Sequence, residues 1–307
     1  MADRLNLQNI YIDLLNKMKT LSAADHDYID HLISLVRVDM GLMDNDISAI
    51  EALIPDNATV LNKLSTITDF PQWTGPGYHN SIYRGKDLGN SVTDDQWAMI
   101  SAGTFDDIFI GDYWTINNIK WRVAHFNYWA QCGDAGSGTS ERHVVIIPAT
   151  SLYSKAMNDT ATSAGGYAGS KMRSDYLADA LTLAENAFGA SHILNHRVRI
   201  SNSVTDGAVD NADWYDSKID LLNEIMCYGC MIASKAHTGN EAGVNKEQLA
   251  IFRNMPSVLN IRSTYWLQGV SSDTNFCTVN LRGIPGSSGA NNENGVRPCF
   301  AIYNPTT

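Results

Sequence analysis

The sequence predicts an α+β protein in which a helical N-terminal part precedes a mixed head. Apolar residues repeat every seven positions between 29 and 54, and strand-like and helix-like segments alternate from about residue 103. At the C-terminus, three strand-like segments enclose a stretch of Gly, Ser, Asn and Pro. We therefore expect a helical attachment segment and neck at 1–65, an irregular linker or strap at 66–100, and a head at 101–307.

The heptad pattern predicts a coiled-coil neck. The residues that fill its a and d positions are Ile29, Ile33, Val36, Met40, Met43, Ile47, Ile50 and Ile54. Isoleucine at both positions favours a homotrimer over a dimer. The alternative is one amphipathic helix on a globular core, which usually carries a wider apolar stripe. Pro55 ends the helix, and residues 5–21 predict a shorter amphipathic helix before it.

The head begins and ends with strands and has helices in its middle. Strands are expected at 108–110, 113–116, 119–126, 143–148, 196–200 and in three segments between 263 and 303. Helices are expected at 170–188, 219–226 and 246–252.

Composition narrows the class of protein. The net charge of −11 and pI near 5.0 argue against nucleic acid as a partner, because phosphate binding needs a basic surface. The sequence has no apolar run long enough for membrane insertion and no apolar signal segment at its start, which predicts synthesis in the cytoplasm. The five cysteines are Cys132, Cys227, Cys230, Cys277 and Cys299. Their odd number and scattered spacing favour small buried thiols, and a metal or redox site at Cys227 and Cys230 is the alternative.

The C-terminal residues resemble a known family. Tyr265-Trp-Leu-x-Gly269 opens this segment, and Gly295-Val-Arg-Pro-x-Phe300 closes it. This order is similar to the C-type-lectin-fold domains of phage and bacterial surface proteins, some of which are the variable proteins of diversity-generating retroelements. Ile119-Lys-Trp-Arg-Val123 and Ser170-Lys-Met-Arg-Ser174 resemble the bacterial and prophage members. The resemblance covers about residues 100–304 and implies a C-type-lectin-like head.

The resemblance also bears on sequence diversification. In retroelement systems, adenine-directed mutagenesis leaves an amino-acid alphabet without Trp, Met, Lys, Glu and Gln. Residues 269–292 contain none of these five types, which is consistent with a diversified region. A Gly/Ser/Asn loop of another origin is the alternative.

A second resemblance lies in the neck. Ile54-Pro-Asp-Asn-Ala-Thr-Val-Leu-Asn-Lys-Leu64 is similar to a segment that follows the coiled coil in trimeric phage fibres. It covers about eleven residues and is independent of the C-terminal match.

The family's binding face maps onto the C-terminal segment. The residues expected to contact a receptor are Tyr265, Trp266, Gln268, Ser271, Asp273, Asn275, Asn280, Arg282, Ser287, Ser288 and Asn291. Aromatic rings supply rigid contact area, and Ser, Gly and Asn supply adaptable hydrogen bonds. A core position is the alternative for Trp266, and Arg297 is expected in a structural ion pair.

No cofactor, metal or catalytic residue is expected. The calcium-binding Glu-Pro-Asn, Gln-Pro-Asp and Trp-Asn-Asp sequences of calcium-dependent lectins are absent, and so are the common hydrolase motifs. Asp213 and Asp216 flank two aromatic residues as in a sugar site, but a solvated turn before the 219–226 helix is favoured. Cys277 and Cys299 lie on neighbouring strands, as in the related formylglycine-generating enzymes, but packing explains them better.

The two resemblances together imply a trimeric phage or prophage fibre on the virion surface. Its N-terminal segment would bind other virion proteins, and its head would bind a bacterial cell-surface protein or glycan. The sequence does not separate a head fibre from a tail fibre. One alternative is a structural capsid or tail decoration protein, and another is a glycan-degrading virion enzyme.

Overall fold

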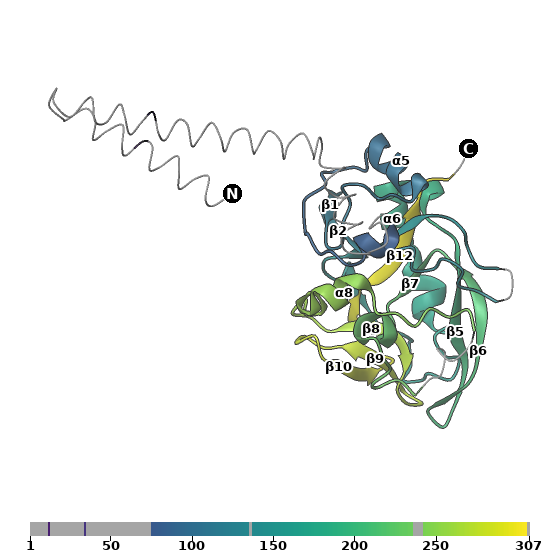
Figure 1. Cartoon of the computed structure of the whole chain (residues 1–307). Coiled ribbons are helices and arrows are strands. Elements are labelled where there is room, and N and C mark those ends of the chain that lie inside the picture. Colours follow the sequence, from purple (N-terminus) through teal and green to yellow (C-terminus); the bar gives the residue numbers. More distant parts are fainter. Residues whose placement is uncertain (1–11, 13–33, 35–74, 135–136, 236–241, 306–307) are drawn as a thin grey trace. The chain divides into compact units, whose positions relative to one another are not determined.

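The computed structural model describes residue 12, residue 34 and the ranges 75–134, 137–235 and 242–305 (Figure 1). From residue 75 onward the described residues belong to one compact unit, the head. The neck positions Ile29, Ile33, Val36, Met40, Met43, Ile47, Ile50 and Ile54 lie outside the described residues, and so does the 5–21 helix apart from residue 12. Trimerisation through the neck therefore stays a prediction.

The head is a mixed α+β structure with more strand than helix, as the sequence predicts at this level. One five-stranded sheet has the order β1-β2-β3-β12-β7, a second has the order β10-β9-β8-β11-β4, and β5 and β6 form a separate hairpin. The bounds are β1 Tyr113–Ile116, β2 Ile119–Phe126, β3 His143–Pro148, β4 Tyr153–Lys155, β5 His196–Thr205, β6 Ala208–Ser217, β7 Ile219–Leu221, β8 Tyr265–Val270, β9 Asn275–Val279, β10 Pro285–Gly289, β11 Asn294–Val296 and β12 Pro298–Tyr303.

The first sheet joins the start of the head to its end. β1 and β2 form a hairpin through Asn117 and Asn118, whose φ values of 52° and 62° suit a tight turn. β12 pairs with β3 on one side and with β7 on the other, so the last strand of the chain lies inside the sheet (Figure 1). Every residue of β3 is buried, as expected for an inner strand covered on both faces.

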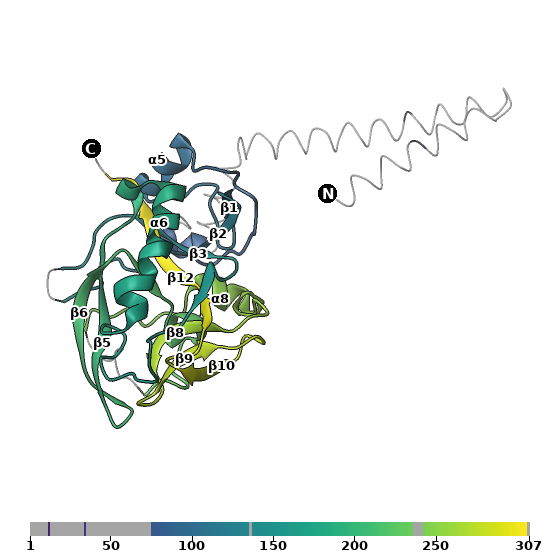
Figure 2. The same cartoon turned by 180° about the vertical axis from the view of Figure 1, so that it is seen from behind.

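The main helix covers the first sheet (Figure 2). It starts with a π-helical turn, Met172–Tyr176, and continues as α6, Leu177–Phe188, which agrees with the predicted helix at 170–188. Phe188 packs against Trp114, Trp121 and Phe300 with ring centroids 5.7–6.1 Å apart. This aromatic cluster fixes α6 to β1, β2 and β12.

The other helices are short. They are α4 Pro76–His79, α5 Asp94–Ala102, α7 Glu224–Tyr228, α8 Ala250–Asn254 and the 3-10 turns Ala190–His192 and Pro256–Leu259. The prediction of one helix at 219–226 is wrong, because Ile219–Leu221 pairs with β12 as β7. The Asn223 side chain then caps α7 by accepting a hydrogen bond from the Met226 amide at 2.8 Å.

The described part of the predicted linker, from residue 75, packs on the head as a strap. Tyr83 and Asp87 form β-bridges to Ile110 and Tyr113. Buried Asp112 accepts hydrogen bonds from the Arg84 guanidinium and from the Lys86 amide. Asp112 directly precedes β1, so this Arg–carboxylate pair fixes the strap beside β1.

Candidate functional site

The predicted contact residues lie in the second sheet and its turns. Because β8, β9 and β10 run antiparallel, the β8–β9 turn (271–274) and the β10–β11 turn (290–293) lie at one end of the sheet. The β9–β10 turn (280–284) lies at the other end. The five residues of β9 separate the two ends by about 17 Å at 3.3–3.4 Å per residue. The eleven predicted residues therefore do not form a single patch.

Three of them are in the core, which corrects their assignment as contact residues. Tyr265 and Trp266 are 0% exposed, and Gln268 is 7% exposed. The Tyr265 hydroxyl donates to the Leu259 carbonyl at 3.1 Å, and the Trp266 indole N–H donates to the Lys155 carbonyl at 2.8 Å. β8 lies between β9 and β11 and is covered on both faces. Successive side chains of β8 point to opposite faces of the sheet, but both faces are buried, so neither set is exposed to solvent.

The end of the sheet formed by the two turns 271–274 and 290–293 is polar and firmly held, and we call it the turn face. Asp273 and Asn291 are exposed on it, while Ser271 and Asn275 are half-buried. Ser163 braces the first turn, because its amide donates to the Asp273 carbonyl and its hydroxyl to the Ser272 carbonyl. The two turns are joined by the Ala290 amide, which donates to the Thr274 carbonyl at 2.8 Å.

The remaining residues lie along β10 and at the far end. Ser287 is exposed on the edge strand, and the Ser288 hydroxyl accepts a hydrogen bond from the Asn292 amide group at 3.2 Å. Asn280 orders its own turn, because its Oδ1 accepts from the Arg282 amide at 2.8 Å and from the Ile284 amide at 3.1 Å. Asn280 is thus a turn-forming residue, whereas Leu281, Arg282 and Ile284 of the same turn are exposed.

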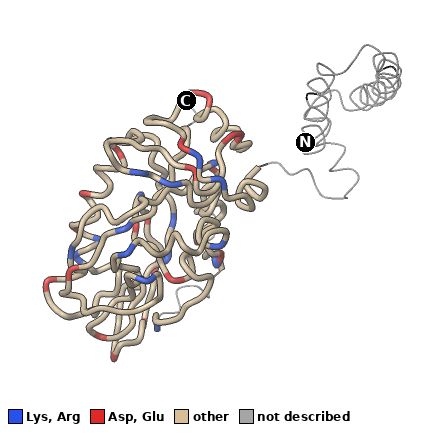
Figure 3. The backbone as a smooth tube through the Cα atoms, turned by 90° about the vertical axis from the view of Figure 1, so that its left-hand side faces the viewer, with Lys and Arg blue, Asp and Glu red and all other residues tan. Residues whose placement is uncertain are grey.

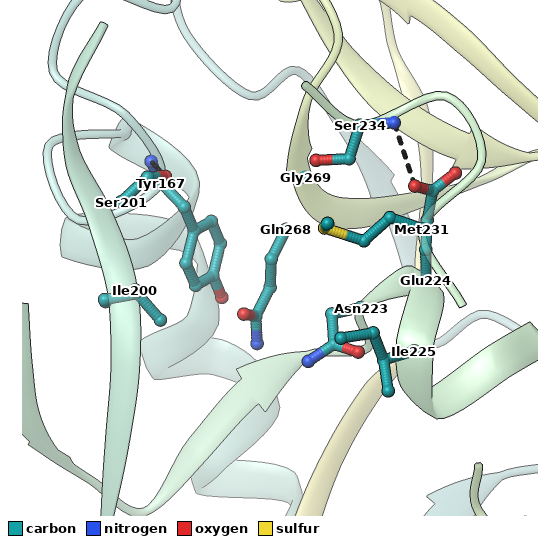
Figure 4. A pocket seen from close by; sticks show the side chains of 10 residues that line it. All are labelled: Tyr167, Ile200, Ser201, Asn223, Glu224, Ile225, Met231, Ser234, Gln268 and Gly269. Atoms are coloured by element: carbon teal, nitrogen blue, oxygen red, sulfur yellow. Dashed lines mark hydrogen bonds between the residues drawn. The ribbon is translucent and has the colours of Figure 1, made fainter. Parts of the chain in front are cut away.

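A small hollow lies next to β8 (Figure 4). The space inside it is about 30 Å³, room for a water molecule and well below the volume of a usual small-molecule site. The lining residues come from loops, β5, α7 and β8: Tyr167, Ile200, Ser201, Asn223, Glu224, Ile225, Met231, Ser234, Gln268 and Gly269. Gln268 lines this hollow, which the sequence did not reveal because its walls come from separate parts of the chain.

The one carboxylate of the hollow is engaged by backbone. Glu224 is 2% exposed and accepts hydrogen bonds from the amides of Ile232, Ala233 and Ser234 at 2.8–3.0 Å. These three N–H groups fix the loop of residues 232–234 around the carboxylate. Its geometry suits loop anchoring better than proton transfer.

The acidic pair Asp213 and Asp216 lies on β6, so its assignment to a turn is wrong. Pairing with β5 extends the strand through Ser217. The Asp216 carboxylate is 3.3 Å from the Arg197 guanidinium, which also bonds Asp134 at 3.0 Å. Arg197 therefore links the hairpin to the loop before β3.

The cysteines are all free thiols. Cys132, Cys227, Cys277 and Cys299 are buried, as predicted, but Cys230 is exposed because it follows α7 in a surface loop. Burial raises the pKa of Cys277 and Cys299 well above the ordinary thiol value. Both are neutral thiols at neutral pH, which supports the packing interpretation.

Arg297 is structural, but the predicted ion pair is wrong. It is 0% exposed and donates to the carbonyls of Pro148 and Val258 and to the Tyr265 hydroxyl at 3.1–3.2 Å. Its guanidinium also lies over the Tyr265 and Phe252 rings. Carbonyl groups and aromatic faces take the place of a carboxylate.

Charges of both signs are interspersed along the described backbone of the head (Figure 3). Within those residues, no helix is both long and apolar enough to cross a membrane. No protein-family model, curated protein or solved structure matches the chain.

Proposed function

We propose that this chain is a virion-associated fibre protein whose head binds a bacterial surface receptor, with the turn face and β10 as the contact surface. The observation that carries the proposal is the pairing of a rigid sheet with adaptable polar turns. The side chains of β8 and most of β9 are buried, whereas Asp273, Ser287 and Asn291 are exposed on turns or an edge strand held by backbone hydrogen bonds. Recognition residues commonly lie on loops positioned by such a scaffold.

The C-type-lectin-like class is part of the proposal. In support, the last described strand of the head enters the same sheet as its first strands, helices occupy the middle, and a separate sheet carries the polar C-terminal turns. The heptad pattern of the neck supports a homotrimer, attached to other virion proteins by the N-terminal segment. Diversification of residues 269–292 would then vary the exposed turns together with the strands between them.

Cell binding by matched surface variants tests the proposal. In the test variant, Asp273, Ser287 and Asn291 are all changed to alanine. In the control variant, Asp95, Ser91 and Asn90, which are exposed near α5, are changed in the same way. Labelled full-length protein is added to candidate host cells. We expect saturable binding that falls about tenfold or more in the test variant and stays unchanged in the control.

Two results would count against this function. Equal cell binding by the two folded variants would remove the turn face as the contact surface. Absence of binding to any host, with the head instead buried against capsid or tail, would favour the decoration role. Sugar release from host polysaccharide, measured in the same supernatants, would favour a glycan-degrading enzyme.

A further inference from the structure

Most of the exposed large apolar side chains that the structure describes in the head lie around the β9–β10 turn. Leu281 and Ile284 belong to this turn, and Met255 lies in the neighbouring loop after α8; the three are 40–56% exposed. The fourth such residue of the head, Ile232, lies in the loop after α7. Apolar residues scattered singly over a surface need no partner, whereas a group at one place indicates an interaction site. We call Met255, Leu281 and Ile284 the apolar face.

Contacts on both sides of the turn bring the apolar face together. The Tyr228 hydroxyl, at the end of α7, donates to the Gly283 carbonyl at 3.1 Å. On the other side, a Cβ on Gly283 would be 3.3 Å from the backbone nitrogen of Asn260, which ends the 3-10 turn after Met255. In both Figure 1 and Figure 2, α8 and β10 lie on the same side of the head. The next residue, Ile261, is half-buried and extends the apolar surface.

The described chain enters the head beside this face. The Asn80 carbonyl accepts hydrogen bonds from the side chains of Arg253 and Asn254 at 3.2 and 3.0 Å, and Met255 is the next residue. Asn80 follows the single turn of α4, so the strap begins about 6 Å from it along the helix. The turn face, by contrast, lies at the other end of the second sheet.

The proposed trimeric neck makes a second copy of the chain the available occupant. Residues 55–74 are all that separates the predicted end of the neck helix from the strap. A short tether keeps linked modules at an effective concentration of about millimolar. A contact too small to hold free heads together therefore forms readily between heads that share a neck.

The charges around the face also suit a second copy. Its exposed cations are Arg253, Arg262 and Arg282, and residues 253–262 and 280–284 contain no carboxylate. The chain carries a net charge of −11, so a neighbouring copy is acidic outside its own apolar face. Arginine stems add apolar area to an interface while their charged ends reach past it.

We propose that the apolar face is the contact between heads in the homotrimer, with Leu281 and Ile284 of the three chains packed around the three-fold axis. This inference rests on the proposed trimer and adds an interface within the head to the one predicted in the neck. Because the turn faces lie at the opposite ends of the second sheets, this contact leaves them free for a receptor.

Cysteine cross-linking of the full-length protein tests the contact. Cys230, the one exposed thiol among the five cysteines, is first replaced by serine. Leu281→Cys is then compared with Thr205→Cys, an exposed position next to the hairpin tip that contacts the β8–β9 turn. Each trimer is treated with a short bismaleimide and analysed on denaturing gels. We expect at least about tenfold more linked chains in Leu281→Cys, because only its thiols meet at the axis.

A second measurement tests whether the contact stabilises the trimer. Leu281→Asp combined with Ile284→Asp brings six carboxylates together at the axis, whereas Thr205→Asp leaves them in solvent. Sedimentation during dilution in sub-denaturing urea should show the double variant dissociating at a protein concentration at least about tenfold higher than wild type, with the control unchanged. An unchanged circular dichroism spectrum establishes that the heads are folded.

A trimer that gives no excess of Leu281→Cys cross-links, or one whose dissociation the aspartates leave unchanged, would overturn the inference. The neck trimer and the receptor function would then stand without it. A wild-type monomer, both in solution and on the particle, would instead remove the trimer itself, and the head contact with it.

Discussion

At the scale of single residues, three buried histidines make the head sensitive to acid. His143 accepts a hydrogen bond from the Trp129 amide at 3.0 Å, His125 accepts one from the Ala250 amide at 3.0 Å, and His196 stacks on the Trp129 ring at 3.8 Å. Desolvation by burial lowers the pKa of His125 and His196 to about 3 and that of His143 to about 4. Each must stay neutral for the core to remain packed.

The stability of the head should therefore fall in mild acid. The unfolded chain binds protons on these histidines near pH 6.5, whereas the folded chain does so only near 3–4, so their contribution is complete above pH 6.5 and is lost as the pH falls. Between pH 7 and 5 we expect a loss of about 2 kcal/mol per histidine in the free energy of unfolding. Urea denaturation at both pH values measures it. His196→Phe should reduce the loss by about 2 kcal/mol, the contribution of one histidine, and an unchanged pH dependence would contradict the assignment.

Arg297 gives a second prediction at this scale. Its planar guanidinium reaches two carbonyls and one hydroxyl, a geometry that a lysine ammonium does not reproduce. Arg297→Lys should destabilise the head by about 3 kcal/mol, although the charge is kept. Chemical denaturation checks this value, with Arg282→Lys as an exposed control that should change stability by less than about 0.5 kcal/mol.

At the scale of elements, local sequence patterns predicted β1, β2, β3, β8, β9, β12 and the helix at 170–188, because their apolar periodicity matches their final burial. The strand predicted at 108–110 is wrong, since only Ile110 forms an isolated bridge there, and β10 lies in the segment expected to be a loop. The same patterns failed for β7, which takes its conformation from pairing with β12. The strand predicted at 196–200 is also too short, because pairing with β6 extends β5 to Thr205. The turn composition indicated the turn face, but the burial of Trp266 depends on two neighbouring strands that sequence spacing cannot place.

The tip of the β5–β6 hairpin is a testable element. Asp206 and Gly207 both have positive φ, 50° and 73°, as a two-residue hairpin turn requires. Gly207→Ala should destabilise the head by about 1–2 kcal/mol and weaken receptor binding, because its Cβ would press on the β8–β9 turn. Gly89→Ala is the control, since it has a φ of 102° and nothing within 4 Å of its Cβ position. Equal thermal shifts in the two variants would show that the contact with the turn contributes nothing.

At the scale of the whole molecule, the prediction concerns oligomeric state. Full-length protein should sediment with three times the chain mass of 33.7 kDa. Replacing Ile33 and Ile47 with aspartate should yield monomers, because charges at core positions of the heptad cannot be buried. Cell binding should then weaken by about a hundredfold through lost avidity. A wild-type monomer, both in micromolar solution and on the particle, would exclude the trimer.

The position of β12 inside the first sheet has a consequence for how the head is made. Residues 298–303 are translated after all the other described strands, yet β12 is the strand that joins β3 to β7 in the first sheet. Long-range strand pairing of this kind forms late in folding. A ribosome that stalls or terminates inside the loop region therefore releases a chain without a closed core, a natural substrate for proteases. Only chains translated past residue 303 would form the closed first sheet.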